Sequence, residues 1–394
     1  MNNKNILISG AGIAGTTLAY WLKEFGFNPT IVERAPVLRQ GGYAIDFWGA
    51  GFDVAERMNI LPALDKVDLQ MVELVFVDEK NRREASMNYK KIKKMMEGRA
   101  FTLLRSDLAK VIYESLPQDI EIIFGDSISK IEQKPDGVSV TFESGNQRDF
   151  DLLFGADGLH SNVRCLVFGN EEQFEKFYGY YTSSFTVENV TNNEKEFLTY
   201  NVPCKQAAIY SITENRSATF FIFTSPEKLS YNYHDTQAQK QILRNQFESI
   251  GWKCKEILSK MDSAPDYYFD VVSQIRMNNW SKGRVTLVGD ACDCPSLLSG
   301  QGSTLAMVGA YILAGELKEA NGDYQTAFSN YEKIFKPFID QKQQIAQNFA
   351  KSLVPKTNFG IWFRNLVIKL MFLPFLSKVF IKQFSDYKLK MKNY

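Results

Sequence analysis

The sequence contains few of the residues that form metal centres and hydrolytic triads. Only two histidines, His160 and His234, occur in 394 residues. The five cysteines follow no regular spacing, and they are Cys165, Cys204, Cys254, Cys292 and Cys294. No H-E-x-x-H or G-x-S-x-G motif is present. We therefore expect no metal site and no Ser-His-Asp triad.

Excess charge and long apolar runs are also missing. Lys and Arg total 46 against 45 Asp and Glu, a net charge of +1, which argues against nucleic-acid binding. No uncharged apolar stretch reaches the ~18 residues of a membrane span, and no secretory signal is visible at the start. Hydrophobic residues make up 45% and aromatic residues 13%, which argues against disorder. These features predict a soluble cytoplasmic monomer without stable membrane insertion.

The first motif lies at the N-terminus. An apolar run at 5–9 predicts a buried strand, the pattern at 16–25 predicts a helix, and 29–34 predicts a second strand. Between the first strand and the helix stands Gly10-Ala-Gly12-Ile-Ala-Gly15. This order is typical of a dinucleotide-binding βαβ unit.

Each position of this motif has a physical role. Gly10 permits the tight turn, Gly12 lets the backbone approach a pyrophosphate, and Gly15 lets helix and strand pack closely. The helix N-terminus offers free N–H groups to phosphate. Glu33, at the end of the second strand, would accept hydrogen bonds from ribose hydroxyls.

Two more turns carry glycine and aspartate. An apolar strand ends in Gly289-Asp290 and leads through Pro295 and Gly300-Gln-Gly302-Ser303 into a helix over 304–317. Asp157-Gly158-Leu-His-Ser161-Asn-Val-Arg164 is the other turn, and Arg105 begins a predicted helix over 105–115. Taken singly, Asp290 is also compatible with a helix N-cap, Asp157-Gly158 with an ordinary turn and Arg105 with a surface position.

Together these motifs resemble the single-component flavin monooxygenases of the aromatic-hydroxylase (para-hydroxybenzoate hydroxylase) class. The resemblance implies that Asp290 bonds the ribityl chain or pyrophosphate of FAD and that Arg105 reaches FAD. It also implies that the loop from Pro295 to Ser303 lies under the flavin ring. The D-G-x-x-S-x-x-R motif would join FAD and nicotinamide recognition.

Within that class, the segment from Gly289 to Leu317 resembles the tetracycline-inactivating monooxygenases. Arg39-Gln-Gly41-Gly42-Tyr-Ala-Ile-Asp46 is similar to the segment whose arginine meets NADPH and whose aspartate meets FAD. Many members have Gly-Asp-Ala-Ala-His where this chain has Gly289-Asp-Ala-Cys292-Asp293, so no histidine role is carried over. Arg39 and Arg164 are candidate contacts for the NAD(P)H phosphates.

We therefore expect an FAD site formed by Gly10, Gly12, Ala14, Gly15, Glu33, Arg34, Arg39, Asp46, Arg105, Asp157, Gly289, Asp290, Pro295, Gly300, Gly302 and Ser303. No catalytic acid or base is named, because the cofactor carries the chemistry. FAD would be tightly bound, and NADPH or NADH would bind transiently, since only one dinucleotide fingerprint is present.

The predicted fold is α/β, with a Rossmann-type FAD-binding domain like that of para-hydroxybenzoate hydroxylase, an inserted β-sheet substrate domain and C-terminal helices. The FAD domain would comprise 1–70, 98–175 and 273–325, the substrate domain 71–97 and 176–272, and the helical region 326–394. Phe221 and Phe223 are candidate substrate contacts, although core packing fits either side chain as well.

The C-terminal segment 361–383 combines apolar residues with recurring lysines. By resemblance it is a lid helix at the substrate entrance. A basic amphipathic helix on an anionic membrane and simple domain packing are the alternatives.

The resulting prediction is an FAD-dependent monooxygenase. NAD(P)H would reduce FAD, O₂ would add at flavin C4a, and the hydroperoxide would deliver one oxygen to an aromatic or polycyclic substrate, with tetracycline as the specific candidate. The alternatives are monooxygenation of another phenolic or polyketide metabolite, another FAD enzyme such as a reductase or dehydrogenase, and a non-catalytic FAD- or drug-binding protein. A halogenase would carry W-x-W-x-I-P, which is absent.

Overall fold

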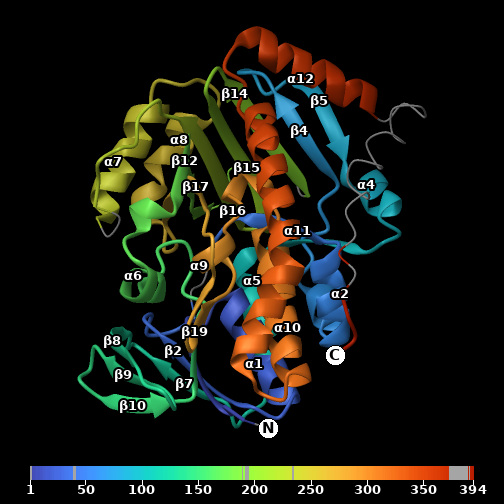
Figure 1. Ribbon diagram of the computed structural model, residues 1–394. Coiled ribbons are helices and arrows are strands. Elements are labelled where there is room, and N and C mark those ends of the chain that lie inside the picture. The colour runs from blue at the N-terminus through green and yellow to red at the C-terminus, as the bar shows by residue number, and fades with distance from the viewer. Residues whose placement is uncertain are drawn as a thin grey trace.

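The computed structural model describes residues 2–38, 41–188, 190, 195–232, 235–371, 389 and 391–394. Its lower part in Figure 1 is formed around a six-stranded sheet. In spatial order the strands are β18 (Ser281–Lys282), β19 (Val285–Leu287), β11 (Leu152–Gly155), β1 (Asn5–Ser9), β2 (Asn28–Glu33) and β7 (Glu121–Phe124). β19 through β7 pair in parallel, and β18 is antiparallel to β19.

The parallel pairing positions the motifs. Strands β19, β11, β1 and β2 are neighbours, and each runs directly into a segment that the sequence analysis selected. Because parallel strands have their carboxyl ends at one edge, the turns after these four strands meet there. Segments as far apart in sequence as Gly10 and Asp290 therefore face the same space.

Helices cover this sheet and connect it to smaller sheets. Helix α1 (Ile13–Glu24) packs against α10 (Gly302–Glu319) and α5 (Arg105–Glu114). The short sheets are β3 (Ala44–Trp48) with β6 (Ala100–Leu104), and β8 (Ile128–Gln133), β9 (Val138–Phe142) and β10 (Gln147–Phe150). The remaining helices of this part are α2 (Ala50–Arg57), α3 (Leu61–Lys66), α6 (Asn162–Phe168) and α9 (Asp290–Asp293), with 3-10 turns η1 (Glu171–Gln173) and η3 (Leu297–Ser299).

A second, eight-stranded sheet forms the upper part of Figure 1. Its strands are β17 (Tyr268–Ile275), β12 (Glu175–Ser184), β16 (Arg216–Thr224), β15 (Lys205–Thr213), β14 (Glu196–Val202), β4 (Glu73–Val77) and β5 (Arg83–Asn88), with β13 (Thr186–Glu188) beside β16. Helices α7 (Thr236–Phe247) and α8 (Cys254–Ser259) contribute apolar side chains to the core on one face. The elements α4 (Tyr89–Met95) and η2 (Met261–Ser263) complete this part.

Two helices follow in the C-terminal region. The long α11 (Tyr324–Leu353) runs past both sheets, and α12 (Asn358–Met371) lies across β5 and β14 (Figure 1). Of the predicted segment 361–383, residues 372–383 lie outside the described part. The last residues return to α10, where the ring of Tyr394 lies 5.1 Å from that of Tyr311. The mixed α/β architecture with C-terminal helices confirms the predicted fold class. Among the described helices, none has both the length and the apolar content of a membrane span.

Candidate cofactor and substrate site

A single cavity of about 3400 Å³ opens at the carboxyl edge of the parallel sheet and extends to the eight-stranded sheet. Most of the predicted site residues line it, although they come from six separate segments. They are Gly10, Gly12, Ala14, Glu33, Arg34, Asp46, Arg105, Asp157, Asp290, Pro295, Gly300, Gly302 and Ser303. The fold therefore brings together residues that are up to about 290 positions apart.

Three predicted residues have a different placement. Gly15 lies away from the cavity, and a Cβ there would stand 1.9 Å from the Gly10 carbonyl oxygen, so close packing is its role. Gly289 adopts φ +66°, and a Cβ would approach Ala14 at 3.0 Å, so it serves the turn behind the cavity. Arg39 lies outside the described residues.

The first glycine turn leaves its helix open to a ligand. Gly12 caps α1 with no side-chain hydrogen bond, and a Cβ at Gly12 would meet nothing within 4 Å. Glu33 accepts backbone N–H bonds from Ala11 at 2.8 Å and from Ala35 at 2.9 Å, and so it holds the turn beside the end of β2. The free N–H groups of α1 therefore face the cavity and suit a phosphate.

The segment from Gly289 to Ser303 also leads into a helix whose N-terminus has no side-chain cap. Gln301 caps α10 without a side-chain hydrogen bond, and Gly300 takes the left-handed conformation at φ +63°. A Cβ at Gly302 would lie 3.7 Å from the Asp290 carboxylate, so this acid stands beside the first turn of α10. Burial raises the pKa of Asp290, and the Arg105 charge opposes that shift.

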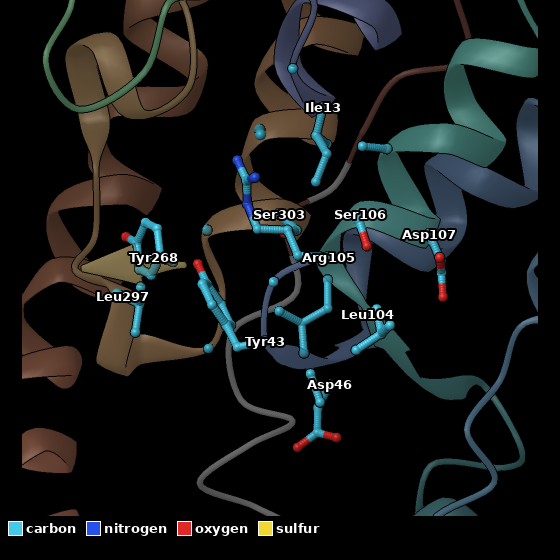
Figure 2. Close-up of a pocket in the computed structure, with 18 of the residues that line it drawn as sticks. Ile13, Tyr43, Asp46, Leu104, Arg105, Ser106, Asp107, Tyr268, Leu297 and Ser303 are labelled. Carbon is cyan, nitrogen blue, oxygen red and sulfur yellow. The ribbon is translucent and has the colours of Figure 1, made fainter. Parts of the chain in front are cut away.

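Asp46 lines the cavity from strand β3 of the short sheet, and Arg105 lines it from the start of α5, which follows β6. Figure 2 shows Arg105 near Ser303 at the start of α5, with Asp46 lower in the view than Tyr43 and Leu104. Burial alone would lower the pKa of Arg105, yet Tyr43, Asp290 and Tyr268 raise it, which keeps the guanidinium charged. Asp46 accepts a bond from Thr102 Oγ1 at 3.0 Å, and desolvation raises its pKa to about 6.

The contacts of the segment 157–164 contradict the prediction that Arg164 binds NAD(P)H phosphates. Asp157 lines the cavity, but its carboxylate also accepts bonds from Ser161 Oγ at 2.5 Å and Val163 N at 2.9 Å at the start of α6. Arg164 is 0% exposed and pairs with Glu171 at 2.7 Å. A guanidinium that is buried and paired in this way is not a contact for NAD(P)H phosphates, so that expectation for Arg164 is wrong.

His160 belongs to a network that the sequence analysis missed. Its Nδ1 lies 2.9 Å from Glu171, and its Nε2 lies 3.2 Å from Asp270 on β17. Burial would lower the pKa of His160, but the two carboxylates raise it to about 10. No motif includes Asp270, and its contact with His160 joins residues 110 positions apart, so no local signal in the sequence could reveal it.

Aromatic side chains wall the cavity on the side of the eight-stranded sheet. The ring of Tyr43 lies 5.7 Å from that of Tyr268 and 5.8 Å from that of Phe220. Figure 2 shows Tyr43, Tyr268 and Leu297 grouped on one side of the pocket. Tyr43 follows the Gly41-Gly42 pair that the sequence analysis selected, whereas Tyr268 and Phe220 carry no local signal.

The substrate predictions for Phe221 and Phe223 are wrong. Both rings are 0% exposed and belong to the core under α7, where Phe221 lies 4.9 Å from Phe247. Side chains alternate along a strand, so their neighbour Phe220 faces the cavity instead. The sequence identified the correct strand but not its orientation.

The site as a whole fits a flavin dinucleotide. Two uncapped helix ends, an open backbone at Gly12 and the half-buried, charged Arg105 favour an anionic pyrophosphate. Asp290 and the neighbouring loop offer polar contacts beyond it, and the aromatic wall suits a planar organic molecule. The cavity is large enough for both ligands.

Comparisons with known proteins agree with this geometry. A family model described as an FAD binding domain matches residues 3–341. The uncharacterized protein Rv1260 of Mycobacterium tuberculosis is 42% identical over 350 residues, 88% of this chain and 93% of the relative. A flavin-dependent monooxygenase of Legionella longbeachae is 37% identical over 355 residues, 90% of each chain. The crystal structure of tetracycline destructase Tet(51) superposes with a TM-score of 0.86 at 33% identity over 100% of both chains.

Proposed function

This chain belongs to the family of FAD-dependent monooxygenases, and we propose that it uses NAD(P)H and O₂ to hydroxylate an aromatic or polycyclic substrate. The family identifies an oxidoreductase with FAD as its cofactor. FAD supplies the redox chemistry, namely acceptance of a hydride and transfer of one atom of O₂ to an electron-rich carbon. The observation that carries the proposal is the meeting of three glycine-bearing turns and an aromatic wall in one cavity.

The chain's own residues would hold and shield the cofactor. The N-terminus of α1 with Gly12 would bind the pyrophosphate, and Glu33 would accept a ribose hydroxyl. Asp290 would bond the ribityl chain, and the loop at Gly300 would lie under the ring. The open end of α10 would stabilise negative charge on the reduced ring. We assign these roles to residues 1–70, 98–175 and 273–325.

The substrate would lie between the loop after Pro295 and the eight-stranded sheet. Tyr43, Tyr268 and Phe220 offer an aromatic wall, and such a dry surface suits a planar ring system. The likeness to Tet(51) makes tetracycline the first substrate to test. Residues 71–97 and 176–272 would form this substrate part.

The test uses the purified yellow protein with NADPH or NADH, O₂ and tetracycline. We expect NAD(P)H oxidation that accelerates with substrate, O₂ uptake in equal amount and a product heavier by one oxygen atom in mass spectrometry. The G12V variant, which should bind FAD poorly, is the control. Oxidation without an oxygenated product would indicate a reductase, and a yellow protein that no substrate stimulates would indicate a binding protein.

A further inference from the structure

Helix α12 is apolar on two opposite faces. Its inner face packs on β5 and β14, where Ile368 joins a buried cluster with Phe76 and Ala85. Its outer face exposes five large apolar side chains, which are Phe359 at 71%, Trp362 at 57%, Phe363 at 53%, Leu366 at 36% and Leu370 at 41%. The spacing i, i+3, i+4, i+7 and i+11 places these five side chains on one stripe.

This outer face is unusual on the molecule. The described residues expose eight large hydrophobic side chains, and five of them belong to this stripe. A surface helix normally turns polar residues to water, so a contiguous apolar stripe with three aromatic rings indicates an interaction surface. The ring of Phe359 stacks on that of Phe363 and contacts that of Trp362 in a tilted arrangement, so the three rings form one group.

The basic charge of the surrounding sequence indicates an anionic partner. Residues 351–391 contain eight Lys or Arg and a single acid, Asp386, whereas the next basic residue, Lys392, pairs with Glu316 and Glu319 on α10. Because the whole chain carries +1, the segment 351–391 carries +7 and the rest carries −6. Lys356 and Lys369 are exposed at the start of α12 and near its end. Arg364 is engaged inward, where it lies 4.1 Å over the ring of Phe76 and 2.9 Å from Asn201.

We propose that the outer face of α12 docks on an anionic lipid surface. The aromatic side chains would enter the headgroup region, and the exposed Lys356 and Lys369 would meet anionic headgroups. A second copy fits less well, because such a dimer would bring two strongly basic segments together. The proposed docking is peripheral, since the described part of α12 has 14 residues and is shorter than a span.

The inner face connects this surface to the cavity. Ile368 belongs to a cluster with Phe76 that Leu74 and Met87 pack against, and Leu74, Phe76 and Met87 also line the cavity. Docking through the outer face would therefore place this end of the cavity close to the lipid surface. The proposal stands on the surface of α12 and does not depend on the reaction proposed above.

The test is sedimentation of the full-length FAD-loaded protein with vesicles of phosphatidylcholine alone or mixed with phosphatidylserine. We expect binding to the anionic vesicles only, which weakens as salt is added. The double variant W362S/F363S should bind at least about tenfold more weakly, while L166S, which alters an exposed leucine on α6, should bind as before. The double variant K356E/K369E should also weaken binding, and K4E/K66E, at two exposed lysines elsewhere, should not. Retention of FAD and an unchanged thermal midpoint show that each variant is folded.

A second readout follows Trp362 itself. The W362F variant should remove most of the blue shift in tryptophan emission that anionic vesicles cause. Equal sedimentation with neutral vesicles, or none with anionic ones, would overturn the proposal. A dimer that W362S/F363S dissolves would show that a second copy covers this face. If Trp362 is already protected from acrylamide in free protein, the chain itself covers it, and the proposal also fails.

Discussion

The guanidinium of Arg164 donates a hydrogen bond of 2.8 Å to the backbone carbonyl of Ala291. Arg164 ends the Asp157 motif, and Ala291 follows Asp290, so one buried side chain joins two turns that are 127 residues apart. The same guanidinium donates to the Leu159 carbonyl at 2.6 Å and pairs with Glu171 at 2.7 Å. Arg164 therefore holds the turn that contains Asp157 against the turn that contains Asp290.

Replacing Arg164 should destabilise the protein. R164M removes three bonds to groups that are wholly or partly buried, and we expect a loss of about 3 kcal/mol in the free energy of unfolding. The matched control is R148M, which breaks an exposed pair with Glu121 and should cost less than about 1 kcal/mol. Urea unfolding of both variants measures the difference. Similar losses would refute the positioning role.

Two glycines of the first turn should fail in different ways. G12V adds a side chain in open space where the cofactor would lie, so the apoprotein should unfold normally while the Kd for FAD rises at least about tenfold. G15A forces a methyl group against the Gly10 carbonyl and should destabilise the apoprotein by about 2 kcal/mol. Thermal unfolding and FAD titration distinguish the two effects. Normal FAD binding by G12V would contradict the site.

Adjacent phenylalanines on β16 should separate stability from substrate binding. F221A removes a fully buried ring and should cost about 4 kcal/mol. F220A removes a ring from the cavity wall, so it should raise the substrate KM while costing less stability. Steady-state kinetics and unfolding of each variant test this. The reverse pattern would restore Phe221 as the substrate contact.

His160 should remain protonated across the neutral range. Its folded pKa of about 10 lies above the ordinary 6.5, so the protonated ring stabilises the fold fully below about pH 6.5 and loses this effect as pH rises through about 10. H160Q should lose about 2 kcal/mol at pH 7, a value reduced for partial exposure of the ring.

The measurement can be unambiguous because the chain has only two histidines. In protein labelled at histidine, the H234N variant leaves one imidazole signal for NMR titration. That signal should show no transition between pH 5 and 8. A titration near pH 6.5 would mean that Asp270 and Glu171 do not hold the proton on His160.

Local chemistry made much of the cofactor site predictable. Gly10, Gly12 and Asp290 belong to turns that the sequence predicts, because each turn lies between an apolar strand and a helix and contains the glycine that a tight turn requires. The placement of Phe221, Phe223 and Arg164 was not predictable in this way. A strand of four successive aromatic or apolar residues shows no alternation, so its inner and outer faces depend on what packs above it.

The amino-acid sequence alone is enough to predict three glycine- and aspartate-bearing turns that follow strands, because φ angles, helix ends and short apolar runs are local properties. Which side chains share the cavity depends on how distant segments pack together. The strand order β19-β11-β1-β2 brings the turns to one edge, and the packing of β17 near the Asp157 turn brings Asp270 within 3.2 Å of His160. Such neighbours depend on contacts between distant segments, which no local pattern encodes.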